Sequence, residues 1–212
     1  MEFGSLSVLL TGPRSTLLPV PPKKEPLAVE IRVYRPVDED TCVAIYNENE
    51  PGRFPEGAVG LFRQFLHDSG YLKLLALDNG KPAAVGGIGL IPGLFSDVAW
   101  LVFGMVKPTL HGQGIGTAML LARLAALPRP VKPIRVLLSN VEASAGFFAR
   151  FGFVRHGQMP LPTSGEFLEV KSALLDGIGW DTCHALIRRM GIDVAALPPV
   201  PILDLWKAPF KT

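Results

Sequence analysis

Cysteine is scarce in this 212-residue chain: only Cys42 and Cys183 occur, without the spacing typical of a metal site or redox pair. An excess of charge is also missing, because 21 basic and 19 acidic residues leave a net charge of +2. This balance gives no electrostatic reason to expect binding to nucleic acid or to an acidic membrane surface. We therefore expect no metal, no nucleic-acid partner and no membrane partner, and a reduced, cytoplasmic setting.

An uninterrupted hydrophobic run of membrane-spanning length is missing too. Residues 83–106 are apolar apart from Ser96 and Asp97, but five glycines and Pro92 interrupt them. A helix exposed to lipid does not tolerate such interruptions without a special reason. Two neighbouring buried strands explain the same composition, and we favour them over a membrane span. The first apolar patch, residues 6–10, is short and follows no basic region, so it does not resemble a signal peptide.

The most informative stretch is residues 106–120, VKPTLHGQGIGTAML, in which three glycines stand at alternate positions. A β-branched, apolar run precedes it and ends at Pro108, and an apolar-periodic segment follows from Met119. This pattern predicts a strand, a glycine loop and a helix. Alternate glycines leave the backbone N–H groups at the helix start unblocked, and the helix dipole adds positive potential. The loop is therefore suited to a phosphate or a pyrophosphate.

Two familiar glycine loops do not fit. A Walker loop requires Lys after its last glycine, whereas Thr117 follows Gly116, and the dinucleotide fingerprint Gly-x-Gly-x-x-Gly is one residue longer. The stretch resembles the acyl-CoA pyrophosphate loop of the GNAT N-acyltransferase superfamily, Gln/Arg-x-x-Gly-x-Gly/Ala after a V-x-P strand end. His111 stands where that pattern has Gln or Arg. A purely structural glycine turn before a core helix is the alternative.

A second resemblance to the same family lies downstream, in residues 139–153, SNVEASAGFFARFGF. The family pattern there is Asn-x-x-Ala-x-x-(apolar)-Tyr-x-x-x-Gly-Phe. When the Gly-Phe pairs are aligned, Phe148 takes the place of the Tyr and Ser144 that of the Ala, while Asn140 lies one residue from the Asn. The resemblance covers roughly residues 31–169.

The resemblance implies an α/β fold with a mixed, mostly antiparallel central sheet, helices on both faces, and fourth and fifth strands that splay apart to admit CoA. Periodicity alone predicts only a mixed α/β domain. The expected strands are 30–34, 71–77, 82–91, 98–106, 134–139 and 153–158, with 202–206 as a candidate last strand. The expected helices are 38–47, 56–67, one from the glycine loop to just before Pro128, 144–151 and 180–190. Residues 78–80, Asp-Asn-Gly, predict a hairpin turn, and residues 47–55, NENEPGRFP, predict a turn around Pro51.

Three parts are expected along the chain: a proline-rich arm at 1–27, a GNAT-like acyltransferase domain at 28–174, and a C-terminal extension at 175–212. Residues 13–26 should be extended, and we expect the arm to dock on another surface and not to remain free in solvent. The apolar extension should pack on the core or across an interface with a second copy, so a homodimer is one expected arrangement.

The resemblance implies acetyl-CoA, or another acyl-CoA, as co-substrate. A backbone N–H near Val106 would polarise the acyl carbonyl as an oxyanion hole does. The residues expected to hold the acyl-CoA are Met105, Val106, His111, Gly112, Gln113, Gly114, Ile115, Gly116, Thr117, Asn140, Ser144 and Phe148.

The catalytic groups are not evident from the sequence. Phe148 has no hydroxyl to protonate the leaving thiolate, and residues 98–103 carry no carboxylate to accept the proton of the amine. Three carboxylates remain as candidates, although turn and loop roles explain them better: Asp97, Glu166 and Glu169. Ser144 and Asn140 are candidates for hydrogen bonds to the thiolate. Three isolated histidines are better explained as surface or structural residues: His67, His156 and His184. Arg53, in the predicted loop between the first two helices, is a candidate for holding an acidic acceptor group.

Three functions are compatible with these features. The favoured one is an N-acyltransferase that moves an acetyl or short acyl group to a primary amine by direct attack, the acceptor being a small molecule or a protein. The second is a non-catalytic acyl-CoA-binding regulatory or scaffold protein, suggested by Phe148. The third is an α/β interaction domain without CoA, which requires that both motifs arise by coincidence.

Overall fold

The computed structural model describes residues 13–20, 29–53, 58–93, 97–140, 142–160, 167–192 and 197–203. The strands are β1 (Val29–Val33), β2 (Leu72–Asp78), β3 (Lys81–Ile91), β4 (Val98–Val106), β5 (Ile134–Asn140), β6 (Val154–Pro160) and β7 (Phe167–Leu175). The helices are α2 (Glu39–Arg53), α3 (Val59–His67), α4 (Ile115–Ala125), α5 (Glu142–Ala149) and α6 (Gly177–Arg189), with 3-10 turns η1 (Pro36–Asp38) and η2 (Pro108–Leu110).

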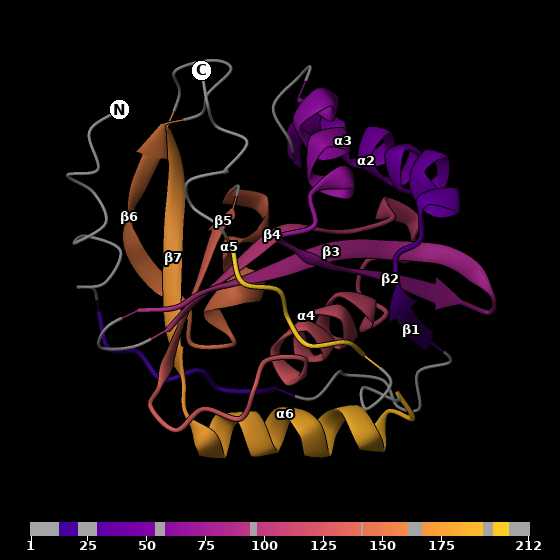
Figure 1. Ribbon diagram of the computed structural model, residues 1–212. Helices are drawn as coiled ribbons and strands as arrows, with labels where there is room; N and C mark the ends of the chain where they lie inside the picture. Colours follow the sequence, from indigo (N-terminus) through magenta and orange to yellow (C-terminus); the bar gives the residue numbers. More distant parts are fainter. Residues whose placement is uncertain are drawn as a thin grey trace.

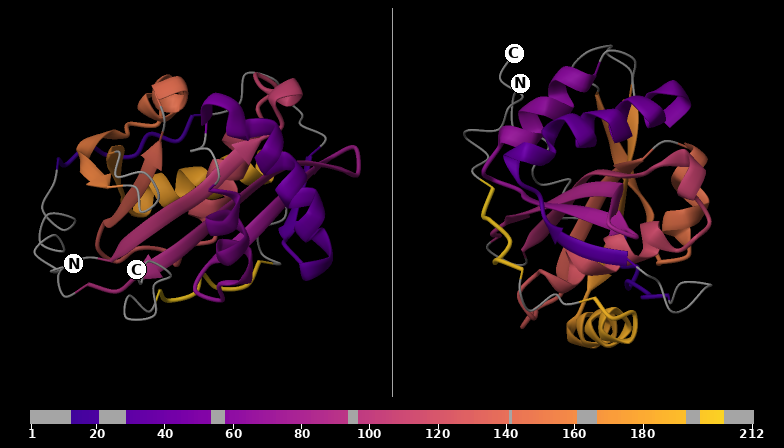
Figure 2. Two further views of the ribbon diagram at one scale, coloured as in Figure 1. Left: turned by 90° about the horizontal axis from the view of Figure 1, so that it is seen from above. Right: turned by 90° about the vertical axis from the view of Figure 1, so that its right-hand side faces the viewer.

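These strands form one seven-stranded sheet in the order β1-β2-β3-β4-β5-β7-β6 (Figure 1). Every neighbouring pair is antiparallel except β4 and β5, which are parallel. Helices α2 and α3 cover one face of the sheet, whereas α4 lies on the opposite face with α6 stacked outside it (Figures 1 and 2). The predicted fold class, a mostly antiparallel sheet with helices on both faces, is therefore confirmed.

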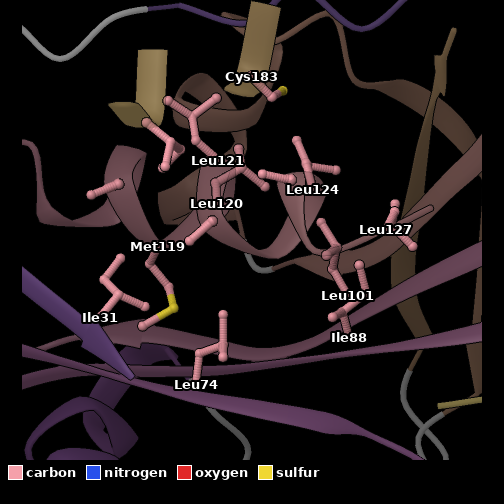
Figure 3. Close-up of a cluster of buried hydrophobic side chains, with 14 of the residues drawn as sticks. Ile31, Leu74, Ile88, Leu101, Met119, Leu120, Leu121, Leu124, Leu127 and Cys183 are labelled. Carbon is pink, nitrogen blue, oxygen red and sulfur yellow. The ribbon is translucent and has the colours of Figure 1, made fainter. Parts of the chain in front are cut away.

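Helix α4 forms the centre of the larger hydrophobic core. All but one of its eleven residues are buried, because the sheet covers one side and α6 covers the other. Figure 3 shows Met119 directed at the sheet and Leu121 directed at the helix that carries Cys183. A helix enclosed on opposite sides requires apolar residues around most of its circumference. This explains why MLLARLAAL, which follows the glycine loop, is apolar except for Arg123.

Most predicted elements are present, with bounds shifted by a few residues. The hairpin turn between β2 and β3 is confirmed, since Asn79 and Gly80 both have left-handed φ angles, 48° and 75°. Residues 82–91 and 98–106, the stretch that could be mistaken for a membrane span, lie in β3 and β4. No helix in the described ranges is long and apolar enough to cross a membrane.

Two sequence interpretations are wrong. Residues 47–53 continue helix α2 although they include Pro51, so the helix ends six residues later than predicted. The buried side chain of Asn49, in this last part of the helix, donates to the carbonyl of Ile45 (2.9 Å). Strand β7 was not predicted, although Glu169 and Lys171 alternate with Leu168 and Val170 as in a strand with one buried face; the buried Ser172 is the polar residue that departs from this alternation. It lies between β5 and β6 and ends at Leu175, next to the expected limit of the acyltransferase domain.

The described part of the N-terminal arm docks on the sheet, as predicted. Leu17 donates its N–H to the Leu174 carbonyl (2.7 Å), and the Leu174 N–H donates to Ser15 (2.7 Å). The side chain of Leu17 is buried in the main core. The arm thus continues the sheet alongside β7, beyond the point where β6 begins.

The C-terminal extension packs on the core of the same chain. α6 starts at Gly177, where Asp176 caps it by accepting from the Gly179 N–H (2.8 Å). The candidate last strand is reduced to a single bridge between Ile202 and Leu90 at the end of β3. Residues 204–206 lie outside the described part of the chain.

Candidate active site

Strands β4 and β5 are paired only over the first part of β4. Val98–Leu101 align with Arg135–Leu138. Immediately afterwards, the register between β3 and β4 slips at Phe103 and Gly104, and Phe103 has a left-handed φ of 45°. A bulge of this kind bends and twists a strand, so β4 turns away from β5. Its edge from residue 102 to 106 therefore borders the expected gap between the two strands.

The backbone at Val106 points into this gap. The N–H of the next residue, Lys107, donates to Ala83 of β3 (2.8 Å). Because peptide groups alternate in direction along a strand, the N–H and C=O of Val106 point away from β3. Two side chains reach the Val106 carbonyl: Asn49 Nδ2 at 3.0 Å and His111 Nε2 at 2.9 Å. The Val106 N–H lies on the same side, where an acyl carbonyl could accept from it.

His111 and Asn49 tie three elements together at this carbonyl. A carbonyl oxygen only accepts hydrogen bonds, so the Nε2 of His111 must carry the proton. His111 connects the glycine loop to the end of β4, and the buried Asn49 connects α2 to the same atom. His111 thus fixes the loop relative to the strand. The family pattern, which has Gln or Arg at this position, did not predict this role.

The glycine loop forms an open cradle at the start of α4. Gly112 and Gly114 have φ angles of 79° and 92°, which L-residues with side chains rarely adopt. Gly114 is the N-cap of α4, and no side chain caps this helix end by a hydrogen bond. The N–H groups of its first turn are therefore left for an anion. A Cβ at Gly112 would meet nothing within 4 Å, so the loop can accommodate a pyrophosphate.

The expected loop residues differ in exposure, and Val106, Gly114 and Gly116 are half-buried. Met105, Ile115 and Thr117 are buried, so they could contact CoA only through the backbone. The side chains or Cα atoms of His111, Gly112 and Gln113 are exposed. The loop therefore presents mainly backbone donors.

Helix α5 brings aromatic rings to the other side of the cradle. Phe148 is half-buried, and its ring packs against Phe147 and Phe153 with centroids 5.0 and 5.7 Å apart. Phe147, which the sequence did not single out, comes closer to the loop, since a Cβ at Gly116 would lie 3.7 Å from its ring.

Two other expected residues stand near the end of β5. Asn140 closes the strand and aligns with Glu169 of β7, but its side chain lies outside the described part of the structure. Ser144 lies in the first turn of α5 and is half-buried. Both therefore occupy the strand end and helix start that the resemblance implied.

Asp97 is placed at the wrong end of β4 for catalysis. Its carboxylate accepts from the Gly93 N–H (3.2 Å), and its carbonyl accepts from Arg135 (3.0 Å). The nine positions between Asp97 and Val106 correspond to about 30 Å of strand. Asp97 is a turn residue that precedes the strand.

Glu169 is neutralised by neighbouring cations, with Lys171 at 3.2 Å and Arg155 at 3.7 Å. Glu166 lies outside the described residues. The three histidines have structural contacts: Glu39 for His67 (3.2 Å), Ser172 Oγ for His156 (3.1 Å) and the Ala125 carbonyl for His184 (2.8 Å). Arg53 is the last residue of α2 and not part of a loop, and its side chain is outside the described part.

The bulged strand and the glycine cradle lie within a segment whose sequence matches a known family. Residues 40–153, more than half of the chain, match the family model described as Acetyltransferase (GNAT) family. This chain belongs to the GNAT acetyltransferase family. No sequence among the curated proteins matches it.

Solved structures with TM-scores of 0.50 and 0.54 support the GNAT fold. Arabidopsis thaliana Naa50, in complex with the bisubstrate analogue CoA-Ac-MVNAL, is 16% identical with a TM-score of 0.54, covering 69% of this chain and 98% of that one. An aminoglycoside 6'-N-acetyltransferase complexed with coenzyme A is 12% identical with a TM-score of 0.50, covering 68% and 96%. A Pyrococcus horikoshii protein is 27% identical (TM-score 0.48) over 60% of this chain, which spans only 44% of that chain's length.

The sequence did not indicate which buried polar side chains contact the strands of the candidate site. Asn49 appeared to lie in a turn, and Arg123 was not singled out. Both are buried, and both contact the strands that form the site. A polar residue within a strongly apolar segment, such as Arg123 in MLLARLAAL, was the available signal.

Proposed function

We propose that this chain transfers an acetyl group from acetyl-CoA to a primary amine by direct attack on the thioester. One observation carries the proposal: the glycine cradle and the open edge of β4 meet at Val106, tied by His111. A pyrophosphate on the cradle would direct the pantetheine along residues 102–106 of β4. This arrangement is consistent with the family match.

The protein would act mainly through its backbone. N–H groups of Gly112, Gly114 and Gly116 would bind the pyrophosphate, and the Val106 N–H would donate to the acyl oxygen. The amine nitrogen attacks the carbonyl carbon, and the carbonyl π electrons move to oxygen. When the C=O re-forms, the C–S bond breaks and sulfur leaves as a thiolate. The lost amine proton passes to solvent, and water protonates the thiolate.

Water takes this role because neither usual proton carrier is in place. Phe148 has no acidic hydrogen, and β4 contains no carboxylate. Asn140 and Ser144 would support the departing sulfur by hydrogen bonds, and Phe148 would form an apolar wall beside it. Such an enzyme would be slower than one with a general acid, by about 10²-fold or more.

The absence of both usual proton carriers favours a second candidate, a non-catalytic acyl-CoA-binding regulatory or scaffold protein. Loss of both proton carriers is what a chain that retains binding without turnover would show. The two candidates share the CoA site and differ in whether an amine is acetylated.

The test has two stages. Thermal shift with CoA and with acetyl-CoA measures binding, and release of free thiol from acetyl-CoA over an amine panel measures turnover. The panel includes a peptide beginning MVNAL and an aminoglycoside, because structural neighbours were solved with, or named for, such acceptors. The thiol reagent should report CoA alone, since burial raises the pKa of Cys42 and of Cys183 to about 12.

Each outcome discriminates. Binding with turnover supports the transferase. Binding of acetyl-CoA without turnover on any amine of a broad panel favours the regulatory candidate. Failure of both CoA and acetyl-CoA to raise the melting temperature would contradict both candidates.

A further inference from the structure

Arg123 lies on α4, near the centre of the core, and only 4% of its surface is exposed. Its guanidinium donates to two carbonyls, Nε to Met119 and Nη1 to Gly87, both at 3.3 Å. Burial lowers the pKa of this guanidinium to about 10, and no carboxylate of the described residues opposes that shift. Arg123 is therefore a cation at neutral pH, buried without an anionic partner in the described part of the chain.

Such a cation is unfavourable for folding, since apolar residues of similar size commonly replace buried charges without loss of stability. Its surroundings are nevertheless shaped to fit it. A Cβ at Gly104 would lie 2.8 Å from Nη2, and a Cβ at Gly86 would lie 3.1 Å from Nη1. Any larger residue at these two glycines would collide with the guanidinium. The two glycines thus leave room for the Arg123 guanidinium. Packing alone does not explain why a buried charge that is unfavourable for folding occupies this space.

The position of the guanidinium relates it to the proposed site. Gly104 belongs to the bulge at which β4 leaves β5, two residues before Val106. Arg123 lies directly behind this bulge, on the face of the sheet covered by α4. Charge that develops at the open edge of β4 therefore develops close to a fixed positive charge shielded from water.

We propose that Arg123 is a positioning residue whose buried charge polarises the acyl carbonyl at the edge of β4 from behind the bulge. The inference rests on the proposed function. During attack, electrons move first to the carbonyl oxygen and then, when the C–S bond breaks, to sulfur, so both negative centres form in the gap. A cation already fixed in a medium of low dielectric constant stabilises them without reorganisation.

The test is infrared spectroscopy of acetyl-CoA carrying ¹³C at the thioester carbonyl, which needs no knowledge of the acceptor. In the wild-type protein, we expect binding to shift the carbonyl stretch to lower wavenumber than in free acetyl-CoA. In Arg123→Met, we expect at most half of that shift, with acetyl-CoA affinity retained and a melting temperature equal to or above that of the wild type. Turnover with any acceptor found should fall by about 10- to 100-fold.

Arg188→Met is the matched control, because it removes the same charge from an exposed position on α6. It should leave the carbonyl frequency unchanged. Arg123→Gln, which keeps a donor for the two carbonyls without the charge, replaces the Met variant if that variant does not fold, and the same loss of shift is expected.

A wild-type carbonyl frequency in either folded neutral variant would overturn the inference. Failure of both neutral variants to fold would also overturn it, because it would assign Arg123 to stability. If the wild-type protein bound no acetyl-CoA, the proposed function would fail, and this inference with it. That result is distinct from retained binding with an unchanged frequency.

Discussion

At the scale of single residues, one carbonyl oxygen organises the site. Val106 accepts from Asn49 of α2 and from His111 of the glycine loop, so a strand end, a helix and the cradle have a common fixed point. The two donors differ in exposure, since Asn49 is buried and His111 is exposed. Asn49 therefore contributes mainly to the fold, and His111 can be changed at little cost to it.

His111→Ala is expected to weaken CoA binding moderately, because the cradle loses one tie to β4 but keeps its backbone donors. A lost hydrogen bond of this kind is worth about 1 kcal/mol, which corresponds to a roughly fivefold rise in Kd. Calorimetric titration with CoA measures it. His67→Ala, which removes an exposed imidazole from α3, is the control. Abolished binding in His111→Ala would mean that the imidazole itself is a main ligand of the pyrophosphate.

A second residue-scale feature gives a pH dependence. Asp38 accepts from Arg32 through both carboxylate oxygens (2.7 Å each) and from the Arg35 N–H (2.8 Å). The hydrogen bonds from Arg32 hold the pKa of Asp38 below its usual value. A depressed folded-state pKa stabilises the protein above the unfolded-state pKa, near 4, and this contribution is lost as pH falls through the folded-state value.

Asp38→Asn should therefore lower the free energy of unfolding by about 2 kcal/mol at pH 7, since it removes charged hydrogen bonds. As the pH falls through the lowered folded-state pKa of Asp38, the wild-type carboxyl also becomes neutral, and the difference should shrink. Urea unfolding of both proteins between neutral and acid pH measures it. A difference that stays constant over that range would show that the carboxylate charge contributes nothing.

At the scale of elements, the site depends on how α4 begins and how α5 faces it. The α4 N terminus is open because Gly114 caps it without a side chain. Its C-terminal end is closed from α6, where Trp180 Nε1 donates to Leu127 and His184 Nε2 donates to Ala125, both at 2.8 Å. One end of the helix is thus held by the fold, and the other is left for an anion.

Gly116→Glu is expected to abolish CoA binding and preserve the fold. A Cβ at Gly116 would make ordinary contacts, 3.6 Å to Val106 and 3.7 Å to Phe147, whereas the carboxylate would occupy and repel the pyrophosphate. Thermal shift with CoA measures binding. Gly60→Glu is the control, because Gly60 is an exposed helical glycine on α3 with nothing within 4 Å of its Cβ. A folded Gly116→Glu protein with wild-type affinity would refute the location of the site.

Phe148→Tyr tests whether a proton donor on α5 would speed the reaction. If the chain is a transferase limited by thiolate protonation, a phenol at this half-buried position should raise turnover, by about 10²-fold at best. Thiol release with an identified amine measures it, and thermal unfolding checks the fold. A stable Tyr variant with unchanged turnover, on an enzyme limited by chemistry, would show that the missing hydroxyl does not limit this site.

At the scale of the whole molecule, the described parts of the N-terminal arm (13–20) and of the C-terminal extension (177–192 and 197–203) are built into the fold. The arm makes a single β-bridge with β7 between Thr16 and Leu174. The Thr16 carbonyl oxygen would lie only 2.4 Å from a Cβ at Gly152. Near the C terminus, Leu203 donates to Leu90 at the end of β3 (2.7 Å). We propose that the arm and the extension belong to the same folding unit as the acyltransferase domain.

Leu17→Ala should therefore destabilise the protein by about 2–5 kcal/mol, as for a buried leucine elsewhere in a core. Leu18→Ala is a close control: its side chain is 58% exposed, against 1% for Leu17, and should change stability by less than about 0.5 kcal/mol. Chemical denaturation of the full chain measures both. Equal, small effects of the two changes would mean that the arm does not contribute to the folded unit.

The sequence by itself determined the features in which a residue type dictates its own backbone. Alternate glycines fixed the cradle, because Gly112 and Gly114 adopt left-handed φ angles, and Asn79-Gly80 fixed the hairpin for the same reason. Strands and helices followed from local hydrophobic periodicity. The position of the candidate site could be inferred from these local patterns together with the family resemblance.

Only the tertiary structure decided what each segment meets. Asn49 contacts Val106 across 57 positions, β7 inserts between β5 and β6 despite its polar residues, and Arg123 is buried behind the bulge of β4. These outcomes depend on which distant surfaces become covered, and a burial partner leaves no periodic trace in the local sequence. The sequence therefore determined the cradle for the phosphate, whereas the tertiary structure determined which buried side chains stand behind the edge of the strand.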